Sequence, residues 1–282
     1  MGLVKLIDDG DYQVTVHGSP DQVVPLLVQG KVDVALLPAN LAAVLYHKTM
    51  TDSGPAVPVA AVNNLGVLQL VENGTAVHGW DDLQGMTVTT TGKGTTPQYV
   101  LDYLLRKNGL NPGQDVTVEL DAESTALASR VATTPGMVAV LPQPYTTVLA
   151  AQNPAVRTVL DLTDEWAAVA EPGSQLVTGV LVVRTAFVRD HPQAFATFLA
   201  DYQTSVQYTN DHPREAAVLV AEAGVVPDAA LAQAAIPGCH LVYLDGEAMA
   251  TAVRGYLQVL FDADPQSVGG AVPGDDFFYR AR

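Results

Sequence analysis

Val32-Asp33-Val34-Ala35-Leu36-Leu37-Pro38-Ala39-Asn40 is a short, nearly continuous apolar stretch that ends in Leu-Pro and is followed by a polar residue. Its length predicts a buried strand, and the helical spacing of apolar residues from Leu41 to Tyr46 predicts a helix directly after it. A helix-like segment from Asp21 to Gln29, closed by Gly30, precedes it. This alternation of helix and strand is typical of a mostly parallel sheet covered by helices.

The same pattern returns in Met137-Val138-Ala139-Val140-Leu141-Pro142-Gln143-Pro144, again a buried strand that ends in Leu-Pro before a polar residue. The segments that precede it agree in order, with a predicted strand from Val116 to Leu120 and a predicted helix from Ser124 to Ala132. An internal repeat of this kind predicts two similar units. We therefore expect an α/β protein made of two βαβ lobes with mostly parallel sheets.

The two units differ at their beginnings. The second opens with a predicted strand, Met86 to Thr90, whereas the first opens with the helix-like segment Leu3 to Asp8, followed by an alternating, strand-like segment from Tyr12 to Val16. We therefore expect the first strand of lobe 1 to be missing from this sequence and the native chain to extend further upstream. A first sheet completed by these residues alone would contradict that expectation.

The part of the chain after residue 175 has a different pattern. An apolar strand from Gly179 to Val183 is followed by helices that begin at His191-Pro192 and His212-Pro213, and by a third from Glu247 to Phe261. Such a helical C-terminal tail is expected to pack on lobe 1. Lobe 1 then comprises residues 1–74 and 177–282 and lobe 2 residues 75–176, and the two crossings between them make a two-strand hinge.

The composition excludes several classes of protein. The chain has 282 residues, of which 48% are hydrophobic and 16% charged, as in folded proteins with a sizeable core. Its 14 Lys and Arg against 30 Asp and Glu give a net charge of −16, which argues against nucleic acid as a partner. Cys239 is the only cysteine, so a disulfide within the chain and a cysteine-based zinc site are excluded.

Several motifs carry a resemblance to a known family. They are, in chain order, Val32 to Ala42, Asp82 to Gly85, Thr91 to Pro97, Leu141 to Pro144, Asp161 to Trp166 and Gly269 to Pro273. In this order they resemble the type II periplasmic-binding-protein fold, in particular the nitrate, sulfonate, taurine and pyrimidine group of ABC-transporter substrate-binding proteins. The resemblance implies two lobes that close on a solute for delivery to a membrane permease. Members of this group begin with a strand and a glycine-rich loop ahead of the segment that corresponds to Met1-Gly2-Leu3.

The loop from Thr91 to Pro97 is the strongest candidate for holding the solute. It follows a predicted strand and opens a predicted helix, and in open α/β sheets ligands bind beyond the carboxyl ends of the strands. Its residues Gly92, Lys93, Gly94, Thr95 and Thr96 combine exposed backbone N–H groups, hydroxyls and a helix dipole that favours negative charge. A carboxylate, sulfonate or phosphate-like group fits this loop; the alternative is that Thr95 only caps the helix.

Amide side chains mark further strand ends. Asn40 and Gln143 occupy equivalent positions after the two Leu-Pro strands, and Asn63 and Asn64 lie where the chain approaches its first crossing. Each amide can donate and accept hydrogen bonds to a solute, or can cap a helix or form a turn instead. Glu123, at the start of a predicted helix, is either an acid that recognises an amine or a pyrimidine nitrogen, or a solvated first-turn residue.

The sequence shows no pattern of catalytic residues or metal ligands. The six histidines are scattered, and neither a paired-histidine motif nor a nucleophile elbow occurs, so we expect no catalytic residue, no metal and no cofactor. We expect a monomeric solute-binding component of an ABC importer, whose partners are a small anionic solute (sulfonate, nitrate, carboxylate or pyrimidine-like) and a membrane permease. It is expected to be extracytoplasmic, with the export signal absent from this chain. The alternative is an enzyme on the same scaffold, such as a chorismate dehydratase-like lyase.

Overall fold

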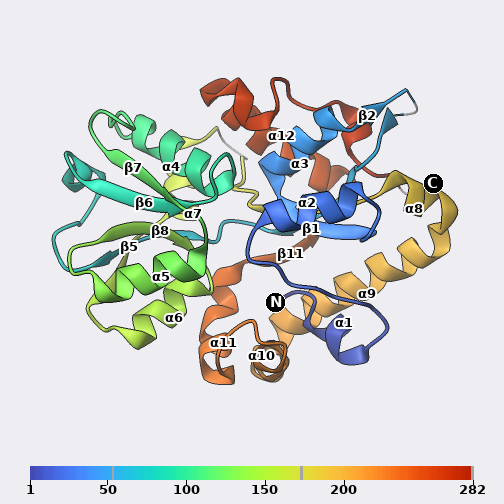
Figure 1. The fold of residues 1–282 in the computed structure, drawn as a ribbon, viewed down its shortest axis with the longest axis horizontal. Coiled ribbons are helices and arrows are strands. Elements are labelled where there is room, and N and C mark those ends of the chain that lie inside the picture. The colour runs from blue at the N-terminus through green and yellow to red at the C-terminus, as the bar shows by residue number, and fades with distance from the viewer. Residues whose placement is uncertain (53, 172–173, 281–282) are drawn as a thin grey trace.

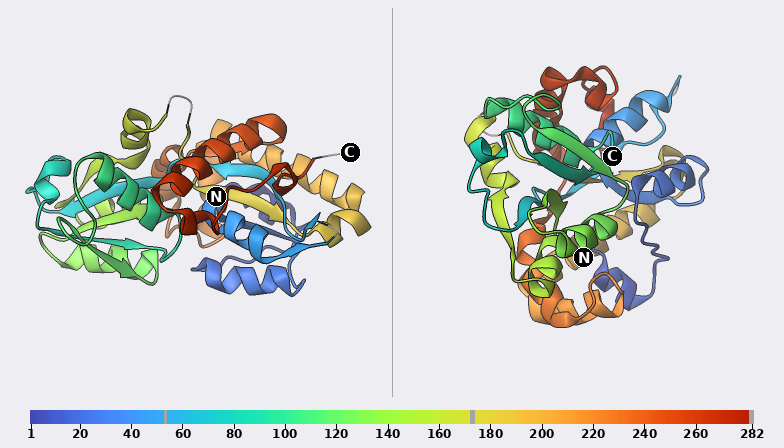
Figure 2. Two further views of the ribbon diagram at one scale, coloured as in Figure 1. Left: turned by 90° about the horizontal axis from the view of Figure 1, so that it is seen from above. Right: turned by 60° about the vertical axis from the view of Figure 1, so that its left-hand side comes forward.

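The computed structural model describes residues 1–52, 54–171 and 174–280 and contains two main sheets, each covered by helices. We call the four-stranded sheet and its helices the first lobe, and the five-stranded sheet and its helices the second lobe. The two lobes lie side by side, the second on the left and the first on the right of Figure 1, and they are separated again in the left view of Figure 2. The predicted α/β class with two lobes is thus confirmed.

The first sheet has the order β1-β10-β4-β11, and its described pairs are all antiparallel. The strands are β1 (Val34–Pro38), β10 (Gly179–Val183), β4 (Val59–Asn64) and β11 (Leu241–Leu244). The expectation of a mostly parallel sheet is wrong for this lobe. The strands are antiparallel because β10 enters the sheet from the other lobe and therefore runs back between β1 and β4.

The second sheet has the order β7-β6-β8-β5-β9. Its strands are β5 (Leu68–Asn73), β6 (Thr87–Thr91), β7 (Thr117–Asp121), β8 (Val138–Pro142) and β9 (Val156–Asp161). β6 runs parallel to β7 and β8, whereas β5 is antiparallel to both of its neighbours. The predicted parallel pairing therefore occurs within this lobe, around β6.

Helices cover both sheets. Those of the first lobe are α1 (Val4–Asp9), α2 (Pro20–Val28), α3 (Ala39–Lys48), α8 (Thr185–Asp190), α9 (Pro192–Asp211), α10 (Pro213–Glu222), α11 (Ala229–Ala235) and α12 (Gly246–Ala263). Those of the second lobe are α4 (Thr96–Lys107), α5 (Ser124–Thr133), α6 (Tyr145–Gln152) and α7 (Leu162–Val169). As expected, proline stands in the first turn of α9 and α10, and the tail packs on the first lobe through α9 against β11 and α12 against β4.

Short elements complete the fold. A small hairpin is formed by β2 (Met50–Thr51) and β3 (Gly54–Pro55), and single 3₁₀ turns span Trp80–Leu83, Pro237–Cys239, Pro265–Val268 and Asp275–Phe277. Within the described ranges, no helix combines the length and the apolar character that a membrane crossing requires.

The boundary that we expected after residue 74 has to be corrected. β5 was assigned to lobe 1 with residues 1–74, but it pairs with β8 and β9 in the second sheet. The chain therefore makes its first crossing at residues 65–67, directly after β4, and its second between α7 and β10. The apolar pattern of β5 cannot reveal this, because it fits the core of either lobe equally well.

The strand expected from Tyr12 to Val16 does not form. These residues run as an extended, mostly exposed segment between α1 and α2, outside any described ladder. An extended segment becomes a strand when a neighbour pairs with its N–H and C=O groups. In the second lobe β6 supplies that partner to β7, whereas the described residues place no strand beside β1 on the side away from β10.

One apolar core runs through both lobes. Trp166 of α7 contacts Tyr103 of α4, with ring centroids 4.9 Å apart, and Tyr256 of α12, at 5.4 Å. Trp166 and Tyr256 are fully buried and belong to the same cluster as β1, β4, β5 and β8 side chains. The lobes therefore share buried surface on the face that carries α4, α7 and α12.

Candidate ligand-binding site

The ends of the strands of the two lobes face each other across the crossings. In the first lobe Pro38 of β1, Gly179 of β10 and Asn64 of β4 are aligned at one edge of the sheet. In the second lobe Leu68 of β5 and Pro142 of β8 are aligned at the facing edge. Because β4 leads into the first crossing at this edge and β10 begins at it, residues just beyond these strand ends lie between the lobes. All nine residues proposed from the sequence are within a few positions of these edges.

Asn40 and Thr96 lie at a direct contact between the lobes. The Asn40 amide nitrogen donates to the carbonyl oxygens of Gly94, at 3.2 Å, and Ser267, at 3.0 Å. The Thr96 hydroxyl donates to Asn40 Oδ1 at 3.2 Å and accepts from the Tyr256 hydroxyl at 3.2 Å. Asn40 is 0% exposed and Thr96 2% exposed. In this arrangement both side chains hold the lobes together, and their hydrogen-bonding groups are engaged.

The loop at Gly92 to Thr95 is held largely by its own hydrogen bonds. Gly94 N–H donates to Gln98 Oε1 at 2.9 Å, Thr95 N–H to Gly92 O at 2.9 Å, and the Thr95 hydroxyl to Gly92 O at 2.8 Å. Gly92 has a φ of +73°, and a Cβ atom there would lie 2.1 Å from Thr95 Oγ1, so this position requires glycine. Lys93 is exposed at the tip of the loop and is its cationic side chain.

Asn63 and Asn64 lie at the carboxyl end of β4, beside Gly179. Asn63 Oδ1 is buried and has no hydrogen-bond donor among the described residues. An unpaired buried acceptor is costly, so a ligand N–H group or a water molecule would be favoured there. Of the nine proposed residues, Asn63 is thus the one whose buried side-chain oxygen lacks a partner among the described residues.

Gln143 lies on the opposite side of the second sheet from Thr96. Its Oε1 accepts from the Thr147 hydroxyl at 2.8 Å, and its Nε2 lies 3.4 Å from Gln69 Oε1. A Cβ atom on Gly238 of the first lobe would lie 3.1 Å from the same Nε2. Gln143 therefore also faces the other lobe, at a separate place from the contact of Asn40 with Thr96.

The sequence did not single out three first-lobe positions that line this region. Gly18, ahead of α2, faces Glu123, since a Cβ atom there would lie 3.3 Å from Glu123 Oε1. Gly238 faces Gln143, and His240 Nδ1 donates to the carbonyl oxygen of Gly66 in the first crossing. Glycines in turns give no sequence signal for contact with another lobe. Glu123 lies at the N-terminal cap of α5.

Burial sets the ionisation of two groups near the junction. It raises the pKa of the Cys239 thiol to about 11, so this thiol is protonated at neutral pH. Burial likewise raises the pKa of the Tyr256 hydroxyl, which keeps it a hydrogen-bond donor to Thr96. Within the part of the chain that the structure describes, no group of three His, Cys, Asp or Glu side chains is placed to hold a metal ion.

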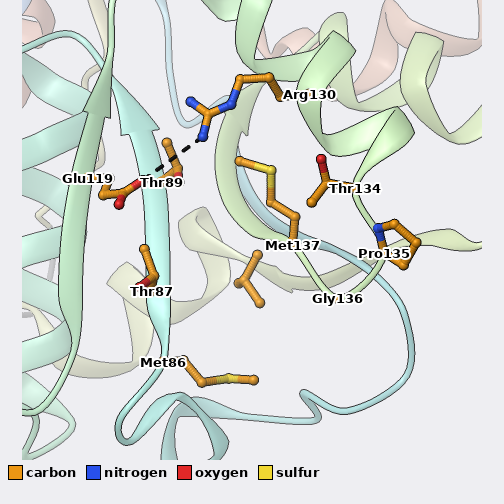
Figure 3. Close-up of a pocket in the computed structure, with 10 residues that line it drawn as sticks. Met86, Thr87, Thr89, Glu119, Arg130, Thr134, Pro135, Gly136 and Met137 are labelled. Atoms are coloured by element: carbon orange, nitrogen blue, oxygen red, sulfur yellow. Dashed lines mark ion pairs between the residues drawn. The ribbon is translucent and has the colours of Figure 1, made fainter.

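A separate surface cavity of about 330 Å³ lies in the second lobe, away from these edges. It is lined at the amino ends of β6 and β8 by Met86, Thr87, Met137 and neighbouring residues, and Arg130 of α5 reaches over it (Figure 3). The Arg130 guanidinium is paired with Asp121 at 2.7 Å and lies 4.0 Å from Glu119. Its charge is therefore balanced, and none of the nine proposed residues lines this cavity.

Two α/β lobes joined by two crossings define the class of two-lobed folds to which this chain belongs. An ABC transporter structure from Parabacteroides distasonis is similar to the chain, with a TM-score of 0.78 at 22% identity, over 100% of this chain and 95% of that one. The periplasmic aliphatic sulphonate binding protein SsuA of Escherichia coli gives a TM-score of 0.72 at 14% identity, over 99% and 86%. The periplasmic nitrate-binding protein NrtA of Synechocystis PCC 6803 gives 0.67 at 12%, over 95% and 80%.

These likenesses show that the chain has the periplasmic binding protein fold. The chain belongs to the NMT1/THI5-like family, whose model matches residues 11–216. No curated protein matches it closely enough to count as a relative. The resemblance inferred from the ordered motifs is thereby confirmed at the level of family and fold.

Proposed function

We propose that the protein is the solute-binding component of an ABC importer, and that it captures a small anionic molecule between its lobes. The observation that carries this proposal is that Asn63 ends β4 of the first lobe and exposed Lys93 follows β6 of the second, each near the edge where its sheet faces the other lobe. The family match and the similar structures, which include sulphonate- and nitrate-binding proteins, support it. In this role the protein is a monomer outside the cytoplasm, and its partner is a membrane permease.

The proposed mechanism is closure of the lobes on the solute. A ligand shifts a conformational equilibrium only by as much as it binds one state better than the other. A solute that touches Lys93 on the second lobe and Asn63 on the first makes both contacts when the lobes are together, so it stabilises the closed form. The closed form is then the one that a permease would recognise.

Lys93 gives the sharpest test of the anionic ligand. A thermal-shift screen of aliphatic sulfonates, nitrate, carboxylates and pyrimidines should identify a ligand that raises the unfolding temperature. For an anionic ligand, Lys93→Ala should weaken binding by roughly 10- to 150-fold in calorimetry, because one charge-assisted contact is worth roughly 1.5–3 kcal/mol. Lys107→Ala removes the same charge from the far end of α4 and should leave the affinity unchanged.

Three results would count against the proposal. If Lys93→Ala binds the ligand as tightly as the unsubstituted protein, the loop does not hold the anion. If no compound of the screened classes binds, the solute belongs to another class. If the protein converts chorismate, seen as a loss of ultraviolet absorbance, it is an enzyme on this scaffold and the transport role falls.

A further inference from the structure

The contact between α4 and the first lobe is built from buried polar groups of both lobes. Asn40, Ser267 and Tyr256 belong to the first lobe, whereas Gly94 and Thr96 belong to the second, and the four hydrogen bonds described above link them in one chain. The side chains of Asn40, Thr96, Ser267 and Tyr256 are all at most 2% exposed. Three of these bonds cross between the lobes, and moving α4 away from the first lobe would break them within an apolar core, where unpaired polar groups are costly.

Aromatic packing reinforces the contact on the same face. Tyr256 donates its hydroxyl to Thr96 and packs its ring against Trp166, which in turn packs on Tyr103 of α4. All three rings belong to the apolar cluster that spans both lobes. Opening the molecule on this face would expose those rings to water, in addition to breaking the hydrogen bonds.

On the opposite face α6 packs on α11, but among the described residues no hydrogen bond joins α5 or α6 to the first lobe. Gly18 of the first lobe meets the exposed carboxylate of Glu123, and Gly238 meets the amide of Gln143. The apolar cluster of α10 and α11 takes in one half-buried second-lobe side chain, Val148, among the residues described. Separating α5 and α6 from α2 and α11 therefore exposes the packing between α6 and α11 but leaves no buried polar group of the described residues without its partner.

We propose that Asn40, Thr96 and Tyr256 form an inter-lobe latch that keeps α4 on the first lobe, so that the cleft opens on one side, between α5 and α2. The latch deepens the proposed function, because it determines from which side a solute enters. It also changes the role of Asn40 and Thr96, whose substitution acts on lobe closure instead of on a direct ligand contact.

Distances between spin labels test this proposal without any ligand, so a failed solute screen leaves the test intact. One pair of labels, at Lys107→Cys and Gln258→Cys, spans α4 and α12. The other pair, at Gln22→Cys and Ser129→Cys, spans α2 and α5. All four positions are exposed, whereas Cys239 is buried with its thiol protonated and should stay unlabelled. Pulsed electron spin resonance then gives both distance distributions in the full chain.

Gly238→Phe should push apart the face on which α5 and α6 meet α2 and α11. A side chain there meets Gln143, so the α2–α5 distance should lengthen while the α4–α12 distance stays as in the unsubstituted protein. Equal lengthening of both distances would overturn the proposal, because the lobes would then open as a symmetric hinge. An unchanged α2–α5 distance would also overturn it, since that face would not be the one that opens.

Thr96→Val should release the latch. It keeps the shape of the side chain but removes the hydroxyl, and we expect a second, longer population in the α4–α12 distance, with the open-to-closed ratio raised about tenfold. Thr95→Val is the matched control, because the hydroxyl of Thr95 bonds within its own loop. Tyr256→Phe removes one hydrogen bond of the latch and replaces Thr96→Val in the test if that variant does not fold. A narrow, unshifted α4–α12 distance in both variants would refute the latch.

Discussion

The two lobes share a plan of three strands but differ in the strands that flank these three. β1 and β8 both end in Leu-Pro, and the order β1-β10-β4 of the first sheet corresponds to β8-β5-β9 of the second. The second sheet continues past β8 with β6 and β7, whereas the first ends at β1 within the described residues. Alternating sequence alone is therefore insufficient to form a strand: Thr117–Asp121 pairs with β6, and Tyr12–Val16, without such a neighbour, stays unpaired.

The open edge of β1 can be assigned to individual residues. Arg184 N–H donates to Asp33 O at 3.0 Å and Ala39 N–H donates to Thr178 O at 3.2 Å, so these positions bond on the β10 side. Because backbone groups alternate in direction along an antiparallel pair, those of Val34 and Leu36 point to the open edge. The corresponding position in β8 is Val140, whose backbone points toward β6.

The largest effect on stability is expected in the apolar core that the two lobes share. Trp166→Ala removes a fully buried side chain that contacts both lobes, and should lower the free energy of unfolding by about 3–5 kcal/mol. Urea unfolding followed by circular dichroism should still show one transition, because both lobes lose the same packing. Trp166→Phe should cost much less. Two separate transitions in the unsubstituted protein would mean that the lobes have independent cores.

A smaller effect should distinguish β1 of the first lobe from β8 of the second, in the stability cost of a proline. Val140→Pro removes an N–H group that faces a paired strand, whereas Leu36→Pro removes one that faces the open edge. After subtraction of the matching alanine variants, Val140→Pro should lower the free energy of unfolding by at least about 2 kcal/mol more than Leu36→Pro, as expected for a lost buried hydrogen bond. Equal costs at the two positions would show that the edge of β1 is paired in solution.

The smallest effect is expected at the junction of the lobes, at Asp102 of α4. Burial raises the pKa of this carboxyl group, and its Oδ1 has no hydrogen-bond donor among the described residues. Arg106 and Gln98 lower that pKa, and the nearby Asp264 of the first lobe raises it. The folded state therefore favours the protonated acid, so the contribution of Asp102 to stability falls as the pH rises through its folded pKa.

Asp102→Asn should accordingly raise the thermal unfolding midpoint at pH 7. The gain should shrink as the pH falls toward about 4, where the aspartate of the unfolded chain also becomes protonated. Calorimetry over this pH range measures the difference, and Asp262→Asn, on the exposed side of α12, is the control for the change in net charge. A gain independent of pH would mean that the buried carboxyl group does not carry the effect.

Much of the fold could be predicted because the repeat is strong. The Leu-Pro strand ends, the helices after them and the helical tail all lie where hydrophobic period and proline position indicate. Strand direction could not be predicted, because β4, β5 and β10 are apolar runs that fit a parallel or an antiparallel sheet alike. The boundary at residue 74 was wrong for the same reason, since the choice of sheet for β5 depends on its partners.

The candidate site was likewise predictable from the sequence only in part. The sequence placed Asn40, Asn63, Asn64, Gln143 and the loop at Gly92 to Thr96 at strand ends, since the period of each strand determines where it stops. Only the tertiary structure decided that Asn40 and Thr96 bond to each other across the lobes and that Asn63 keeps an unpaired oxygen. Hydrogen bonds between residues far apart in the chain depend on how the two sheets pack, and this packing has no local signature in the sequence.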